Sequence, residues 1–113
     1  MQFLALIYAG EDQDDVDMKT LIAQYQVFDK QVEAAGILLG GNALEGVSTA
    51  TSVRVRRGQS EITDGPFAET KEQLGGYYLL ECKDLDEALE WAAKIPSARY
   101  GTIEVRPVMI FDQ

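Results

Sequence analysis

Residues 75–95 read GGYYLLECKDLDEALEWAAKI, and this stretch decides the fold class. Its first part, residues 75–82, places apolar or aromatic side chains on both faces of an extended segment, which predicts a buried β-strand. Asp84 then offers a side-chain oxygen to cap a helix, and Glu87 stands three residues later, as in a capping box. Apolar residues follow at helical spacing up to Pro96, so the strand leads directly into an amphipathic helix.

The rest of the chain contains further elements of these two kinds. Residues 3–9 form a second segment that is apolar on both faces, and residues 18–35 carry an apolar stripe at helical spacing. The order of elements favours an α+β fold of the ferredoxin-like type, in which one antiparallel sheet carries both helices on one face. Alternating strand patterns occupy residues 51–57, 60–63 and 102–108, the first two joined by a hairpin turn at Gly58-Gln59.

Two predicted strands carry apolar side chains on the sheet face that the helices leave bare. A monomer rarely leaves such a face in water, because a large exposed apolar patch favours association. Two copies that pair these faces about a two-fold axis would bury them. We therefore expect one domain over residues 1–113, assembled as a homodimer with a barrel-like core between the subunits.

Composition excludes several classes of function. The 113 residues include 10 Lys and Arg against 19 Asp and Glu, and the net charge of −9 argues against nucleic acids and anionic membranes as partners. The absence of His removes catalytic triads and imidazole metal ligands, and the carboxylates of residues 11–17 do not match an EF-hand, so we expect no metal and no cofactor. The single cysteine, Cys82, excludes an internal disulfide and is predicted to be buried. Residues 3–9 are too short for a membrane span and follow no basic residue, so we expect a cytoplasmic protein.

The alternation of the predicted strands places a polar group on the helix-free face. If a partner covers that face, the charges need carboxylates or an anionic ligand beside them. Arginine suits such ligands because it binds carboxylate and phosphate groups in a bidentate manner. A small-molecule site is one interpretation, and salt bridges at the rim of the sheet are the alternative. The predicted ligand-binding residues are Arg54, Arg56, Tyr78, Glu104 and Arg106.

Residues 64–72 read DGPFAETKE, a loop with strong turn chemistry. Gly65 can take a positive φ, Pro66 fixes the next step, and Phe67 is predicted to anchor the loop in the core. A rigid loop of this kind would aim acidic and basic side chains at the cavity mouth, although a turn residue and a solvated ion pair explain the same residues. The candidate catalytic residues are Asp64, Glu69 and Lys71.

This loop motif, with GGYYL at residues 75–79 and EVRPV at residues 104–108, closely resembles the DGPF family of YCII-related proteins. The likeness spans nearly the whole chain and implies a homodimer of ferredoxin-like subunits, the dimeric α+β barrel. YCII-type relatives have been suggested to be enzymes because of a His-Asp pair in a cleft, which a chain without His does not carry. DGPF proteins are also associated with extracytoplasmic-function sigma factors, so the resemblance implies a sigma factor as a partner.

Three functional hypotheses follow. The first is a protein that binds a small anionic or carbonyl-bearing molecule in a cleft of the homodimer. The second is a cofactor-independent enzyme of the isomerase or lyase type, with Asp64 or Glu69 as acid or base and Lys71 or Arg106 as electrophilic help. The third is an interaction module linked to sigma-factor regulation of transcription. The sequence leaves open whether the protein is an enzyme.

Overall fold

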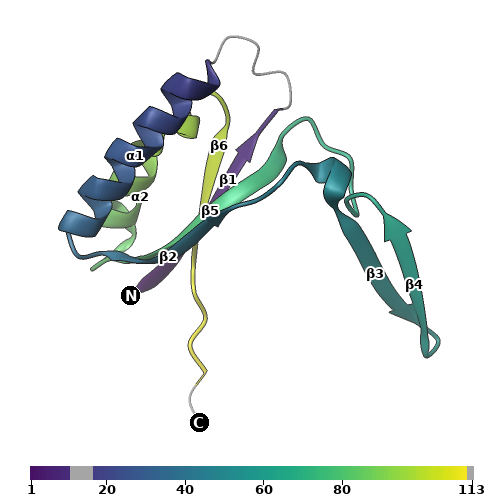
Figure 1. Cartoon of the computed structure of the whole chain (residues 1–113). Coiled ribbons are helices and arrows are strands. Elements are labelled where there is room, and N and C mark those ends of the chain that lie inside the picture. Colours follow the sequence, from purple (N-terminus) through teal and green to yellow (C-terminus); the bar gives the residue numbers. More distant parts are fainter. Residues whose placement is uncertain (11–16, 112–113) are drawn as a thin grey trace.

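The computed structural model of the chain describes residues 1–10 and 17–111. Its main sheet has four antiparallel strands in the order β2-β5-β1-β6 (Figure 1). The two central strands, β5 (Gln73–Glu81) and β1 (Gln2–Ala9), are the two segments predicted from their apolar faces. The edge strands are β2 (Leu38–Ala43) and β6 (Thr102–Pro107).

Both helices, α1 (Met18–Ala34) and α2 (Leu85–Ala93), cover the same face of this sheet (Figure 1). The predicted capping box of α2 is present: the Asp84 side chain accepts a hydrogen bond from the Glu87 amide at 2.9 Å. The Glu87 carboxylate accepts from the Lys83 amide at 3.0 Å. Two short 3₁₀ helices, η1 (Val47–Thr49) and η2 (Pro96–Arg99), complete the described elements, and η2 begins at the proline predicted to end α2. The predicted ferredoxin-like arrangement is confirmed.

The hydrophobic core lies between the sheet and the helices. Burial alternates along β1, where Phe3, Ala5 and Ile7 face the helices. Cys82 is also buried, as predicted, and burial raises the pKa of its thiol. The buried hydrophobic residues are Phe3, Ala5, Ile7, Phe28, Val32, Leu80, Cys82, Ala88, Ala92 and Ile95.

A second, two-stranded sheet departs from the prediction of a single sheet. Strands β3 (Thr51–Arg56) and β4 (Gln59–Asp64) pair only with each other, and they project from the main sheet as an arm, residues 51–64 (Figure 1). The turn lies at Arg57-Gly58, one residue earlier than predicted. Both residues take a positive φ (54° and 76°), as the two central residues of a type I′ turn do. The arm gives the chain a radius of gyration of 16.1 Å, whereas a compact chain of this length has roughly 13 Å.

Candidate functional site

A cleft of about 780 Å³ lies between α1 and the half of the sheet formed by β2 and β5. Much of its wall is apolar, including Leu21 and Ile22 from α1 and Leu74 from β5. The segment that leads from β2 toward the arm, residues 44–47, contributes a further wall. A cleft of this size matches the volume range of small-molecule sites. We call it the α1–sheet cleft.

Four polar side chains from three elements line this cleft together. Tyr25 and Asp29 stand four residues apart on α1 and therefore share one side of the helix. The Tyr78 hydroxyl on β5 donates a hydrogen bond to Asp29 Oδ1 at 2.6 Å. The hydroxyls of Tyr25 and Ser97, the latter on η2, lie 2.6 Å apart, and one of them donates a hydrogen bond to the other. We call these four residues the polar cluster.

Packing holds the Tyr78 ring in place. Phe28, which is buried, meets the ring edge-on at a centroid distance of 5.1 Å. On the neighbouring strand, a Cβ at Gly41 would lie only 2.9 Å from Tyr78 Cδ1 and 2.8 Å from the Tyr77 carbonyl oxygen. Only glycine at position 41 therefore lets β2 approach β5 this closely with the Tyr78 ring packed over it. The hydroxyl of Tyr78 is thus directed at Asp29 by a rigid ring.

The environment keeps both phenols of the polar cluster protonated. Burial raises the pKa of Tyr78 far above its ordinary range, and the hydrogen bond to the Asp29 carboxylate raises it further. Burial also raises the pKa of Tyr25, although its hydrogen bond with Ser97 acts in the opposite direction. At neutral pH both tyrosines therefore present uncharged hydroxyl groups to the cleft.

The predicted ligand-binding residues do not form one group. Glu104 and Arg106 lie on the helix-free face, as predicted, and their charged groups are 3.9 Å apart and largely exposed. Arg54 and Arg56 were expected on the same face, but they lie on the arm, which is not part of the main sheet. Tyr78 was also expected there, yet it faces the helices, because it contacts Phe28 and Asp29 of α1. Tyr78 is thus the one predicted site residue that lines the α1–sheet cleft.

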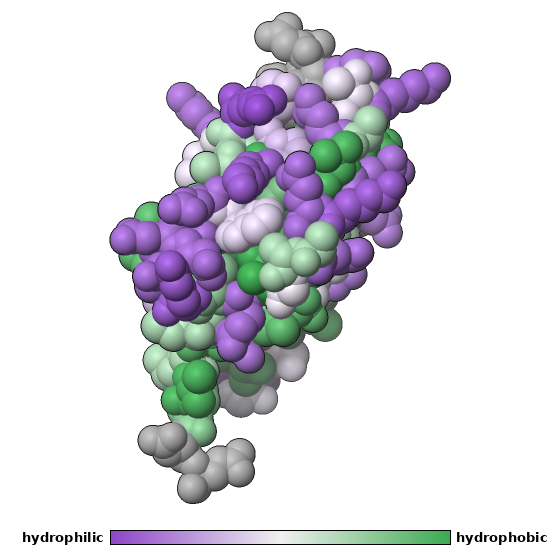
Figure 2. Space-filling view, turned by 90° about the vertical axis from the view of Figure 1, so that its left-hand side faces the viewer, coloured by the Kyte–Doolittle hydropathy of each residue, from purple (hydrophilic) through white to green (hydrophobic). Residues whose placement is uncertain are grey.

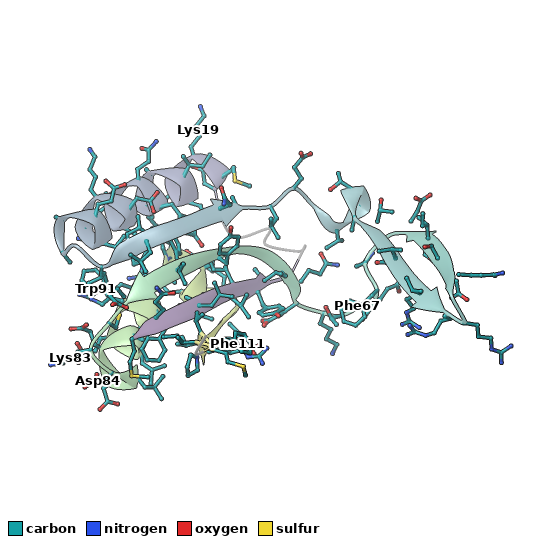
Figure 3. All side chains as sticks on the ribbon, turned by 90° about the horizontal axis from the view of Figure 1, so that it is seen from below. Lys19, Phe67, Lys83, Asp84, Trp91 and Phe111 are labelled. Atoms are coloured by element: carbon teal, nitrogen blue, oxygen red, sulfur yellow. The ribbon has the colours of Figure 1, made fainter. Side chains whose placement is uncertain are left out.

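The candidate catalytic residues Asp64, Glu69 and Lys71 are exposed and do not line the cleft. Phe67 was expected to anchor their loop in the core, but it is 84% exposed in the connection between the arm and the main sheet (Figure 3). The loop is held instead by its backbone: the Gly65 amide donates to the Ala50 carbonyl at 2.7 Å. A positive φ of 100° at Gly65 confirms the predicted turn conformation.

Sequence reasoning missed Asp29 and Ser97, and it treated Tyr25 as a core residue of the helix. A usable signal was the spacing of Tyr25 and Asp29, which puts a hydroxyl and a carboxylate on one side of an amphipathic helix. Ser97 gives no such signal, because its partner, Tyr25, is 72 residues away in the sequence.

Two observations concern metals and membranes. Across residues 1–10 and 17–111, the structure brings together no group of three or more His, Cys, Asp or Glu side chains that is suited to holding a metal ion. In the same described part of the chain, neither helix is long and apolar enough to cross a membrane. Residues 11–16 of the acidic stretch, which does not match an EF-hand, lie outside the described residues.

The fold and the cleft together define a class: an α+β protein of ferredoxin-like topology with a pocket of ligand size beside its helices. The family model of the YCII-related domain matches residues 1–112, and the chain belongs to this family. An uncharacterised protein of Rhizobium meliloti (strain 1021) is 41% identical over 104 residues, which cover 90% of this chain and 81% of that protein.

A solved structure shows the same fold at low sequence identity. It is the 5-chloro-2-hydroxyhydroquinone dehydrochlorinase of Burkholderia phenoliruptrix AC1100, in complex with 2,5-dihydroxybenzoquinone. The two chains align with a TM-score of 0.59 and 14% identity, over 96% of this chain and 94% of the other. At this identity the likeness establishes the fold alone.

Proposed function

We propose that this protein binds a small, uncharged molecule with a carbonyl or hydroxyl group in the α1–sheet cleft. The observation that carries the proposal is the polar cluster, which gathers two tyrosines, a serine and an aspartate in a cleft with largely apolar walls. Apolar walls with a few convergent polar groups are typical of small-molecule sites, because burial supplies affinity and the polar groups supply orientation.

The polar cluster can both accept and donate hydrogen bonds. Asp29 Oδ1 accepts from Tyr78, and a carboxylate has further lone pairs for a ligand hydroxyl. In the pair formed by Tyr25 and Ser97, one hydroxyl donates to the other, so the second proton is available for a ligand carbonyl. A molecule with an apolar body and one or two oxygen functions fits this arrangement.

The charge of the cleft selects against anions. The charged residues that line it are Asp29 and Glu45, and no Lys or Arg is among the described residues that do so. An anionic ligand was predicted from arginines of the helix-free face and the arm, which lie elsewhere. Of the two predicted kinds of ligand, anionic and carbonyl-bearing, we retain the carbonyl-bearing one.

The experiment is a thermal-shift and NMR titration with matched ligands. A panel of small phenols and ketones, including 4-hydroxyacetophenone, is compared with carboxylates of similar size such as 4-hydroxybenzoate. The uncharged compounds should raise the melting temperature of the wild type and shift the resonances of cleft residues, and the carboxylates should not. The shift should be lost in Asp29→Asn and in Tyr78→Phe and retained in Tyr100→Phe, because Tyr100 is exposed and does not line the cleft. A panel without any binder, or binding that both cleft variants retain, would contradict the proposal.

A cofactor-independent enzyme is a second candidate, and the Tyr78–Asp29 pair favours it. A carboxylate and a phenol within 2.6 Å of each other in an apolar cleft are placed for general acid–base chemistry. Asp29 would remove a proton from the carbon next to a ligand carbonyl, and a hydroxyl of the cluster would stabilise the enolate oxygen. NMR in D₂O measures this activity as exchange of ketone α-protons, which Asp29→Asn should abolish. If Asp64→Asn or Glu69→Gln lost the exchange and Asp29→Asn retained it, the activity would belong to the loop of residues 64–72 and not to the cleft.

We also keep the homodimer as part of the proposal. The helix-free face of β1 and β5 carries Leu4, Leu6 and Leu79, which remain partly exposed in one chain. A second copy on this face would bury them. The sigma factor stays a prediction from the family resemblance.

A further inference from the structure

The arm has one apolar and one polar face. Residues directly opposite each other in an antiparallel pair point to the same side, and Val53 stands opposite Ile62. Together with Val55 they form an apolar face on which the exposed fractions are 64% for Val53, 61% for Val55 and 72% for Ile62. The opposite face is polar, with Arg54 across from Glu61.

The chain does not cover this apolar face itself. The two strands of the arm pair with each other only, and they stand away from the main sheet in two perpendicular views (Figures 1 and 3). An isolated two-stranded hairpin is at best marginally stable in water, because it has no third layer against which to pack. The alternation of apolar and polar residues along β3 is that of a strand with one face buried.

The chain exposes more surface than a compact monomer of its mass. Its accessible area is 8464 Å², whereas a compact monomer of this mass exposes roughly 6,200 Å². The difference, roughly 2,300 Å², is of the size that one subunit buries in an obligate dimer. Phe67 at the root of the arm, and Met109, Ile110 and Phe111 after β6, are further exposed apolar side chains. Figure 2 shows that the side of the molecule formed by the helices is largely hydrophilic, with hydrophobic residues interspersed on it.

Charge indicates which partner. Arg57 lies in the turn at the tip of the arm, and Arg56 precedes it at the end of β3, whereas the chain as a whole carries a net charge of −9. The body of a second copy is therefore an acidic surface that complements the basic tip. In a two-fold symmetric homodimer, each arm makes the same contact with the body of the other subunit.

We infer that the arm of each subunit packs its apolar face, Val53, Val55 and Ile62, against a second copy of this chain, with Arg57 in the turn at its tip directed at the acidic body of that copy. The inference rests on the homodimer proposed above and adds to it the contribution of the arm. It also gives the cleft a link to the dimer, because residues 44–47, which line the cleft, lead into the arm. An arm held by the partner would fix that wall.

Sedimentation velocity over a wide range of concentrations tests the inference. The wild type should be a dimer, and Ile62→Asp should raise the dimer dissociation constant by roughly tenfold or more, because it places a charge in the apolar contact. Thr63→Asp is the matched control: it adds the same charge one residue away, on the polar face, and should leave the constant within roughly twofold of the wild type. High salt should weaken the wild-type dimer, since the arginine tip faces an acidic surface.

Hydrogen exchange keeps the test decisive if a variant fails to fold. In the wild type, amides of residues 51–64 should be protected at high concentration and should lose protection on dilution. A monomeric wild type overturns both the homodimer and the arm contact. This holds also if the arm then proves to bind a different protein. A dimer that Ile62→Asp leaves intact, or that Thr63→Asp weakens equally, overturns the arm contact alone. Neither result affects the ligand titrations of the cleft, which are measured independently.

Discussion

Replacing Tyr78 with phenylalanine removes one oxygen atom from the cleft and leaves the aromatic ring in place. The edge-on contact with Phe28 and the fit against Gly41 both involve the ring, so they persist in the variant. The loss is the hydrogen bond of 2.6 Å to Asp29 Oδ1. Tyr77→Phe is the matched control, because it makes the same change in the next residue, whose hydroxyl accepts an exposed hydrogen bond from Asn42.

The structure sets the expected difference between the two variants. A hydrogen bond to a charged group contributes about 1.5–3 kcal/mol to stability, and Tyr78 is only half-buried, so we expect Tyr78→Phe to lower the free energy of unfolding by about 1.5 kcal/mol. An exposed hydrogen bond between neutral groups contributes less, since water replaces it, and Tyr77→Phe should cost about 0.5 kcal/mol or less. Removal of the Tyr78 hydroxyl also leaves Asp29 Oδ1 without its donor in the cleft.

Urea denaturation at one fixed protein concentration measures the difference. With a slope of about 1.5 kcal/mol per molar urea, the midpoint of Tyr78→Phe should fall by about 1 M, and that of Tyr77→Phe by about 0.3 M or less. Equal midpoints for the two variants, both close to the wild type, would refute the argument that the Tyr78–Asp29 pair is a stabilising element of the cleft.

Three further predictions rest on single contacts. The raised pKa of Tyr78 stabilises the fold fully below about pH 10, the ordinary pKa of tyrosine, and this contribution is lost as the pH rises further. Melting temperatures measured above pH 10 should therefore fall more steeply for the wild type than for Tyr78→Phe. Gly41→Ala should destabilise the protein by about 1–3 kcal/mol in denaturation experiments, because its Cβ meets the Tyr77 carbonyl and the Tyr78 ring, whereas Gly40→Ala, with open space around it, should lie within about 0.5 kcal/mol of the wild type. Asp84→Ala removes the N-cap of α2 and should cost about 1 kcal/mol by the same measurement; an unchanged midpoint would show that the cap contributes nothing.

The elements of the fold could be predicted because their signals are local. The capping box at Asp84 and Glu87, the apolar faces of β1 and β5, and the helical stripe of α1 each lie within a short stretch of sequence. The separation of the arm from the main sheet could not be predicted in the same way. Alternation along residues 51–64 shows that one face is apolar, but it does not say against which layer that face packs.

The site was harder to predict, because alternation assigns residues to two faces without saying which face meets the helices. Tyr77 and Tyr78 lie on opposite faces, and both faces of β5 are apolar, so the sequence alone does not decide which tyrosine enters the core. The choice depends on Phe28 and Asp29 of α1, which are distant in sequence. The DGPFAETKE loop attracted attention through its chemistry, yet Asp64 and Glu69 lie outside the cleft.

Crystallographic fragment screening tests the central claim most directly, because it asks where small molecules bind without assuming which one is natural. Crystals of the wild-type protein are soaked with uncharged fragments that carry hydroxyl or carbonyl groups. We predict that bound fragments gather in the α1–sheet cleft, with an oxygen within about 3.2 Å of a polar atom of Tyr25, Asp29, Tyr78 or Ser97. Fragments bound repeatedly elsewhere, with this cleft empty in every data set, would contradict the account.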